Sequence, residues 1–151
     1  MALLCISGCN SDRDALGNYL RDTHPEMTAG VTEVLSAFAE VARSTEPAAT
    51  RIARLDAQVL TPYRAIIDRL TAFSPESATV KKHHDAYLGA AHRQLAAFEA
   101  ARDAILEGRS IDQARGMIQL ARADLINWVT AVDAEANRLG LVLKRPETDQ
   151  P

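Results

Sequence analysis

The chain has 151 residues, of which 47% are apolar and 25% charged, and its 17 basic and 20 acidic residues give a net charge of −3. This length suits one domain that buries roughly two thirds of its unfolded surface, and the Ala- and Leu-rich composition suits helices. Because no block rich in Lys or Arg occurs, we expect no nucleic-acid partner. No apolar run approaches the ~20 residues that span a bilayer. Cys5 and Cys9 alone cannot form a disulfide framework or a four-ligand zinc site.

The N-terminal segment contains the run Ile6-Ser7-Gly8-Cys9, a branched apolar residue and two small residues followed by a cysteine. This run resembles the lipobox of bacterial lipoproteins, in which the thiol accepts a lipid and the preceding residues are removed. The resemblance implies that Cys9 is the lipidation site and that residues 1–8 are the remnant of a signal peptide. Two or three acyl chains would then anchor the protein to a membrane.

The resemblance also implies a location in the bacterial cell envelope, with the domain facing the periplasm. Asn10 directly after the cysteine favours the outer membrane. Residues 9–22 are then expected to be a lipid-proximal tether or a short leading helix. The alternative is a cytoplasmic protein whose N-terminus is a frayed apolar segment.

The remainder of the chain has the apolar spacing of amphipathic helices, with three- and four-residue steps. The four segments run from Met27 to Val41, from Ile52 to Phe73, from Val80 to Ile105 and from Ile111 to Leu139. Short loops between them favour antiparallel neighbours. The predicted fold is therefore all-α, an antiparallel up-down four-helix bundle over residues 23–143, followed by a disordered polar tail at 144–151.

Capping residues predict where these helices begin and end. Thr23 with Glu26 reads as a capping box for the first helix, and Ser110 with Gln113 reads as one for the fourth. Ser74 is the expected N-cap of the third helix. Gly108 and Gly140 are the expected stops of the third and fourth helices, whereas Gly30, Gly89 and Gly116 read as points of close packing.

Pro62 lies inside the second predicted helix. It removes a backbone hydrogen bond and clashes with the preceding turn, at a cost of about 3 kcal/mol. A kink at Pro62, or a break into two helices, is therefore expected between Val59 and Tyr63. Pro25 is likewise expected to separate a short leading helix from the bundle.

The spacing of histidines predicts no metal and no haem or other cofactor. No histidine has an acidic residue three positions before it, and none has a histidine four positions away, as bundle metal sites require. His84 and His92 are separated by roughly 12 Å of helical rise. The chain also lacks a nucleophile elbow and a phosphate-binding glycine loop, so we expect no enzymatic activity.

One layer near the middle of the predicted bundle gathers residues that bind small molecules in other proteins. Equal rise from the loops places Tyr63 level with Tyr87, and Trp128 level with Gly89, with His84 one turn away. Two interpretations remain open: a ligand cavity lined by Tyr63, His84, Tyr87 and Trp128, or a packed core in which the polar tips find partners. Lys81, Lys82 and His83 are expected to be solvated.

Three functions follow from these patterns. The first is a lipid-anchored, non-catalytic interaction module that contacts the membrane through Cys9 and binds a protein partner. The second is a periplasmic small-ligand-binding or sensor bundle. The third is a cytosolic regulatory bundle without lipid.

Overall fold

The computed structural model describes the backbone of residues 6–142 and the side chains of residues 11–142. Within this part of the chain every regular element is a helix and no strand occurs, so the all-α prediction is confirmed. In chain order the elements are α1 (Ile6–Asn18), the π-helical η1 (Tyr19–Thr23), α2 (His24–Met27), α3 (Val31–Arg43), α4 (Ala48–Leu55), the π-helical η2 (Asp56–Leu60), α5 (Thr61–Ala72), α6 (Ala78–Leu106) and α7 (Asp112–Arg138).

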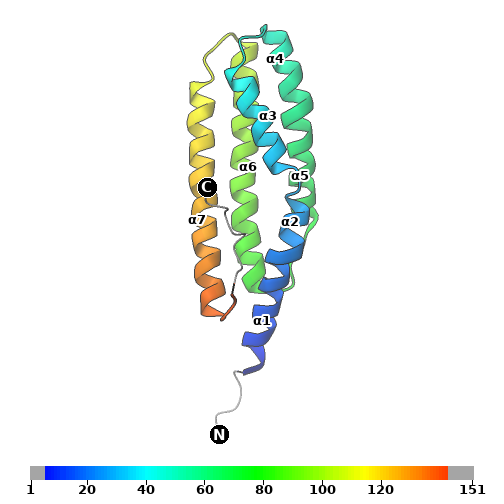
Figure 1. Cartoon of the computed structure of the whole chain (residues 1–151), viewed down its shortest axis with the longest axis vertical. Helices are drawn as coiled ribbons and strands as arrows, with labels where there is room; N and C mark the ends of the chain where they lie inside the picture. Colours follow the sequence, from blue (N-terminus) through cyan, green and yellow to red (C-terminus); the bar gives the residue numbers. More distant parts are fainter. Residues whose placement is uncertain (1–5, 143–151) are drawn as a thin grey trace, which may run out of the picture.

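The helices run roughly along the long axis of an elongated molecule, with α6 in the middle (Figure 1). α7 packs along one side of α6, while α4, η2 and α5 pack along another. α3 contacts α4, η2 and α5, and α1 contacts α6 and α7. α6 is therefore the element that connects the other helices.

Small side chains allow the helices to approach α6 closely. The buried residues of α6 are Val80, His83, His84, Tyr87, Ala90, Ala91, Gln94, Ala97, Phe98, Ala101, Ala104 and Ile105. α7 buries only Ala114, Ala121, Val132 and Ala136. Alanine at these positions brings the two backbones close together, so that the remaining side chains interdigitate at the density of a protein interior.

Both π-helical segments end shortly before a proline. η1 is followed by His24-Pro25, and η2 is followed by Thr61-Pro62. In each case the residue before the proline donates its backbone N–H to the carbonyl oxygen five residues earlier. Proline has no N–H, and its ring crowds the carbonyl four residues back. The wider π turn relieves that crowding, so the chain stays helical through both prolines.

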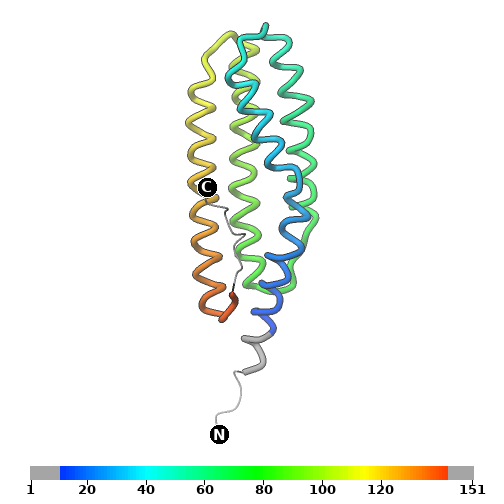
Figure 2. Tube along the Cα trace, viewed as in Figure 1, coloured from blue at the N-terminus to red at the C-terminus, as the bar shows by residue number. Residues whose placement is uncertain are grey.

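The predicted kink at Pro62 thus coincides with a π-helical segment. Figure 2 shows the trace continuing along the same course from α4 into α5. A π-helical turn accommodates Pro25 in the same way. Pro25 therefore does not separate the leading helix from the rest, as had been expected. The helical chain continues from α1 through η1 to α2.

The first predicted helix is interrupted at Gly30 instead. Thr23 lies in a helical conformation and makes no side-chain cap, so the predicted start there is wrong. Gly30 has a φ of +92°, which only glycine adopts without strain. The interpretation of Gly30 as a point of close packing is therefore also wrong: it is a turn residue between α2 and α3.

The leading segment is part of the core. Leu16 on α1 and Tyr19 on η1 are buried in the same apolar cluster as the later helices. The core thus includes residues before position 23, where the bundle was expected to begin. Residues 9–22, for which a tether or a short leading helix was expected, lie in α1 and η1.

The ends of α6 and α7 lie only partly where the sequence predicted them. Gly108 and Gly140 have φ values of +66° and +69°, as helix-terminating glycines do. However, the N-cap of α6 is Ser77 rather than Ser74, because the Ser77 hydroxyl accepts a hydrogen bond from the Val80 N–H. α7 begins after Ile111, without a side-chain cap.

Among residues 6–142, no helix is long and apolar enough to cross a bilayer. The expectations for residues 1–5, for the Cys9 side chain and for the tail at 144–151 lie outside what the structure describes.

Replacing Gly30 or Gly116 by alanine should have opposite effects on the stability of the fold. Gly30→Ala should lower the free energy of unfolding by roughly 1 kcal/mol or more, because alanine at this positive φ is strained. Gly116→Ala should raise it by roughly 0.5–1 kcal/mol, because a Cβ there meets no atom within 4 Å and alanine favours the helix. Urea unfolding followed by circular dichroism measures both, and equal effects would contradict the assignment of Gly30 as a turn.

Candidate functional site

Aromatic and imidazole rings from several elements meet where η1 and α2 cross α6. The cluster, which we call the ring cluster, consists of Tyr19, His24, Phe73, His84, Tyr87 and Trp128. It includes three of the four residues expected to line a ligand layer, namely His84, Tyr87 and Trp128. It also includes Tyr19 and His24, which the sequence did not single out.

Tyr63, the fourth expected residue, makes its contacts in a neighbouring part of the core. Its hydroxyl donates to Oε1 of the buried Gln94 at 2.8 Å. Its ring packs edge-on against Phe98, with 5.2 Å between the ring centroids. Burial raises the pKa of the Tyr63 phenol, with a smaller contribution from Tyr87. The phenol is therefore a neutral hydrogen-bond donor in the core.

A hydrogen-bond chain runs through the ring cluster. His84 Nε2 lies 2.9 Å from the Leu70 carbonyl oxygen, which can only accept, so Nε2 carries the proton. In a neutral imidazole the other nitrogen then accepts, and the Tyr19 hydroxyl, at 3.2 Å, donates to His84 Nδ1. The Tyr19 oxygen is therefore free to accept from His24 Nδ1, at 3.3 Å. The Leu70 carbonyl thus fixes the direction of the whole chain.

This chain connects the N-terminal helical segment to the core. Tyr19 and His24 lie on η1 and α2, whereas His84 lies on α6 and Leu70 on α5. Burial raises the pKa of the Tyr19 phenol, so it stays protonated and serves as donor and acceptor at once. The arrangement stabilises the packing of the leading segment against α6.

His24 lies among aromatic rings with little access to water. Its ring centroid is 4.4 Å from that of Tyr87 and 4.8 Å from that of Trp128. Burial, and to a lesser extent the charge of His84, lowers the pKa of His24 to about 4. His24 is therefore neutral at neutral pH, as the hydrogen bond that it donates to Tyr19 requires.

Trp128 joins α7 to α6. Its indole N–H donates to the His83 carbonyl oxygen at 2.8 Å, and its ring packs edge-on against Tyr87 at 5.0 Å. Burial raises the pKa of Tyr87 to about 12. Trp128 closes the ring cluster on one side, and its other side faces a groove between α6 and α7.

His83 is the site residue that the sequence reading placed wrongly. It was expected to be solvated, but the structure buries it to 1% exposure. Its Nε2 is buried without a hydrogen-bond partner. Burial lowers its pKa, Lys82 lowers it further, and Glu135 opposes the shift. A second apolar stripe on α6, with Ala90 and Ala97 at helical spacing from His83, was the available signal.

Metal binding needs a group of ligating side chains close together. Among the described residues, no group of three or more His, Cys, Asp or Glu side chains is placed to hold a metal ion. The chemistry that the ring cluster offers is hydrogen bonding and aromatic contact.

The low pKa of His24 predicts a pH-dependent stability. The unfolded histidine binds a proton near pH 6.5 and the folded one near pH 4, so the unfolded state gains stability as the pH falls through this window. His24→Phe keeps a ring at this position but cannot titrate. Between pH 7 and pH 4, the wild type should lose roughly 2–3 kcal/mol more unfolding free energy than the variant. Parallel urea titrations measure this difference, and identical pH profiles would contradict the burial of a neutral His24.

The chain was also compared with known proteins. No protein-family model, no curated protein and no solved structure matches it.

Proposed function

We propose that the chain is a lipid-anchored, non-catalytic interaction module of a bacterial envelope, which binds a protein partner through α7. The observation that carries this proposal is the exposure of large apolar side chains on α7. Leu120 is 69% exposed, Ile126 58% and Val129 49%. Isolated surface leucines are ordinary in soluble proteins, whereas neighbouring exposed apolar side chains mark an interaction site. Ile126 and Val129 are such neighbours, and Leu120 lies on a different side of α7.

The packing of α7 supports this role. Its main neighbour is α6, with a smaller contact to α1, and its buried residues all lie toward those helices. Ile126 and Val129 lie about 60° apart on a helical projection, on the side of α7 away from Asp124 and Ala131. This side of α7, which we call the outer face, exposes both of these apolar side chains to a partner.

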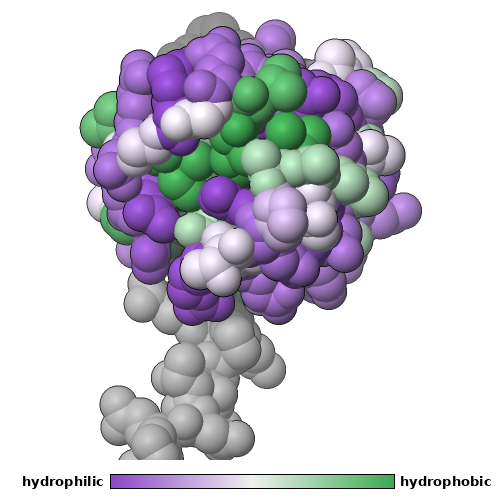
Figure 3. Space-filling view, turned by 90° about the horizontal axis from the view of Figure 1, so that it is seen from above, coloured by the Kyte–Doolittle hydropathy of each residue, from purple (hydrophilic) through white to green (hydrophobic). Residues whose placement is uncertain are grey.

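A second apolar surface lies at one end of the molecule. Figure 3 shows apolar side chains gathered on the end seen from above, where α6 terminates. Leu106, the last residue of α6, is 62% exposed. Figure 1 places this end opposite α1. A partner that binds the outer face can therefore extend its contact onto a surface remote from the anchor.

The finer architecture that we propose is an antiparallel up-down four-helix bundle. Its first rod would comprise α1 to α3 and its second α4, η2 and α5, with α6 and α7 as the third and fourth. The short loops between α3 and α4 and between α6 and α7 support antiparallel neighbours. The extensive contact between α6 and α7 supports the same arrangement.

The anchor in this proposal is a lipid on Cys9. Support comes from the resemblance of Ile6-Ser7-Gly8-Cys9 to a lipobox. Since the α1 backbone includes position 9 and Leu16 is buried, the lipid would be joined to the core by a helix rather than by a flexible tether. The domain would face the periplasm, on the outer membrane.

Lipidation predicts the mass and the location of the protein. Produced from its own gene with a C-terminal tag, the wild-type protein should begin at Cys9, carry diacylglyceryl mass and sediment with membranes. Cys9→Ser should lose both properties, because serine has no thiol to accept the lipid. Intact-mass spectrometry and membrane fractionation measure these outcomes.

Cys5→Ser is the matched control, because residue 5 is removed with the signal and its substitution should change nothing. Wild-type protein that is soluble and unmodified, with Cys9 a free thiol, would overturn the envelope proposal. The cytosolic regulatory bundle without lipid would then take its place.

The outer face predicts site-specific crosslinking in the cell. A photoreactive amino acid at Ile126 or at Val129 should give one discrete product of higher mass, the same from both positions. The same group at Ala65, which is exposed on α5, should not give it. Gel shift and mass spectrometry of the excised product identify the partner.

Equal crosslinking from all three positions, or none from α7, would contradict binding at the outer face. A product of twice the chain mass that contains only this protein would replace the partner by a second copy of the chain.

A further inference from the structure

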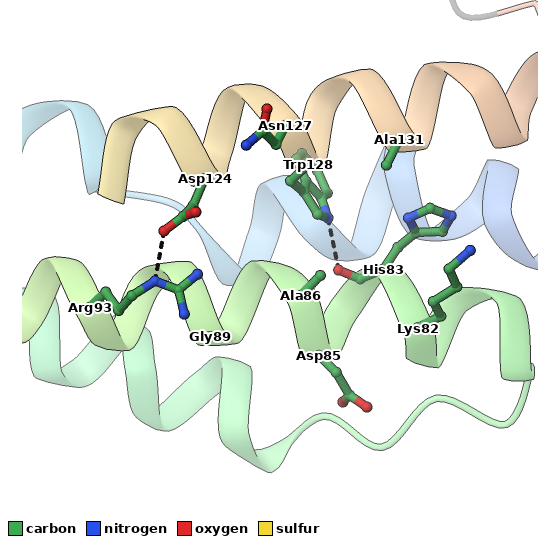
Figure 4. Close-up of a pocket in the computed structure, with 10 residues that line it drawn as sticks. All are labelled: Lys82, His83, Asp85, Ala86, Gly89, Arg93, Asp124, Asn127, Trp128 and Ala131. Atoms are coloured by element: carbon green, nitrogen blue, oxygen red, sulfur yellow. Dashed lines mark hydrogen bonds and ion pairs between the residues drawn. The ribbon is translucent and has the colours of Figure 1, made fainter. Parts of the chain in front are cut away.

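An open groove of about 390 Å³ runs between α6 and α7, on the side of Trp128 away from the ring cluster. This volume lies within the range of roughly 300–1,000 Å³ that is typical of small-molecule sites. Figure 4 shows the lining residues, which all come from these two helices. The groove is separate from the ligand layer that the sequence predicted, and it shares only Trp128 with that layer.

The middle of the groove is lined by small and apolar groups. Ala86 and Ala131 project into the space between the helices (Figure 4), and Gly89 adds no side chain. A Cβ at Gly89 would lie 3.7 Å from Arg93 Nη1. The indole of Trp128 borders this space. Because its N–H is already bonded to the His83 carbonyl, the indole offers an occupant apolar and aromatic contact rather than a hydrogen bond.

One end of the groove is closed by an ion pair. Arg93 Nε donates to Asp124 Oδ2 at 2.7 Å and thereby connects α6 to α7. Each charge is already matched by the other. The nearby Asp85 points away from α7 in Figure 4 and pairs with Lys81 at 2.6 Å. These three carboxylate and guanidinium groups therefore add little unmatched charge to the groove.

The other end of the groove has a different polarity. Lys82 contributes a positive charge there, and His83 lines the same end. Only 1% of the His83 surface is exposed, and its Nε2 has no hydrogen-bond partner among the described residues. A buried nitrogen without a partner is rare in folded proteins. A polar atom that entered this end of the groove would lie beside both Lys82 and His83.

We propose that this groove binds a small aromatic acid, with its ring between Trp128 and the Ala86–Ala131 surface and its acidic group beside Lys82 and His83. The apolar middle selects a flat ring, because the small side chains leave room for one. The carboxylate of Glu135 interacts with both Lys82 and His83, but it is already paired with Arg138. The end at Lys82 therefore favours a negative charge over a positive one. This binding site is independent of the proposed partner surface, since the outer face of α7 does not form part of the groove.

The single tryptophan of the chain makes the test direct, because the groove borders the only indole. Benzoate, benzamide and benzylammonium present one ring with a negative, neutral or positive substituent. Each is titrated into the ¹⁵N-labelled protein, and the Trp128 indole N–H resonance is followed together with the His83 imidazole signals. Benzoate should shift both, benzamide should bind more weakly, and benzylammonium should bind weakest.

Two variants locate the site. Ala86→Leu fills the middle of the groove and should abolish the shifts, whereas Ala123→Leu makes the same change at an exposed position of α7 outside the groove and should leave them intact. Lys82→Gln should weaken benzoate binding about twofold to fivefold, the range for an exposed ion pair, without affecting benzamide.

Benzoate that leaves the Trp128 indole N–H resonance unmoved throughout the titration would overturn the proposal. Equal binding of all three probes would overturn the role of Lys82 and His83. Identical behaviour of Ala86→Leu and Ala123→Leu would show that the probes bind elsewhere.

Discussion

The structure depends on the burial of α6 on more than one side. α7 covers one face of this helix, and α4, η2 and α5 cover another. A helix buried in this way must have small or apolar residues on each covered face, and α6 meets this condition with residues such as Ala90, Ala91 and Ala97. Where polar side chains occur on the buried faces they are bonded, as Gln94 is to Tyr63. His83 is the exception, and it marks the place where the covering by α7 leaves a groove.

The prolines show how the other helices accommodate this central element. A break at Pro25 or Pro62 would have turned the chain away from α6 and exposed the apolar residues that follow. The π-helical turns before both prolines keep the helical course instead, at the cost of less favourable backbone geometry. In η1 this turn also places Tyr19 in the core, where its hydroxyl joins His24 to His84. The π-helical turn that accommodates Pro25 thus also positions the hydrogen-bond chain of the ring cluster.

Trp128 lies between the two features to which we assign roles. On one side it packs in the ring cluster, where the neutral His24 and the protonated Tyr19 stabilise the leading helical segment. On the other side it borders the groove that we propose for an aromatic acid. The outer face of α7 is separate from both. The proposed anchor on Cys9 would be joined to this same region through α1, because α1 contacts both α6 and α7.

The sequence by itself determined the helical class and the stops at Gly108 and Gly140, whereas the kink that it predicted at Pro62 is replaced by a π-helical turn. These properties depend on residue spacing and backbone chemistry within one segment, which the sequence states directly. It also placed His84, Tyr87 and Trp128 toward the interior. Only the tertiary structure decided that His83 is buried, that Tyr19 and His24 complete the ring cluster, and that Tyr63 bonds to Gln94. The physical reason is that these outcomes depend on the rotation and height of one helix relative to another, which contacts between residues far apart in the chain determine.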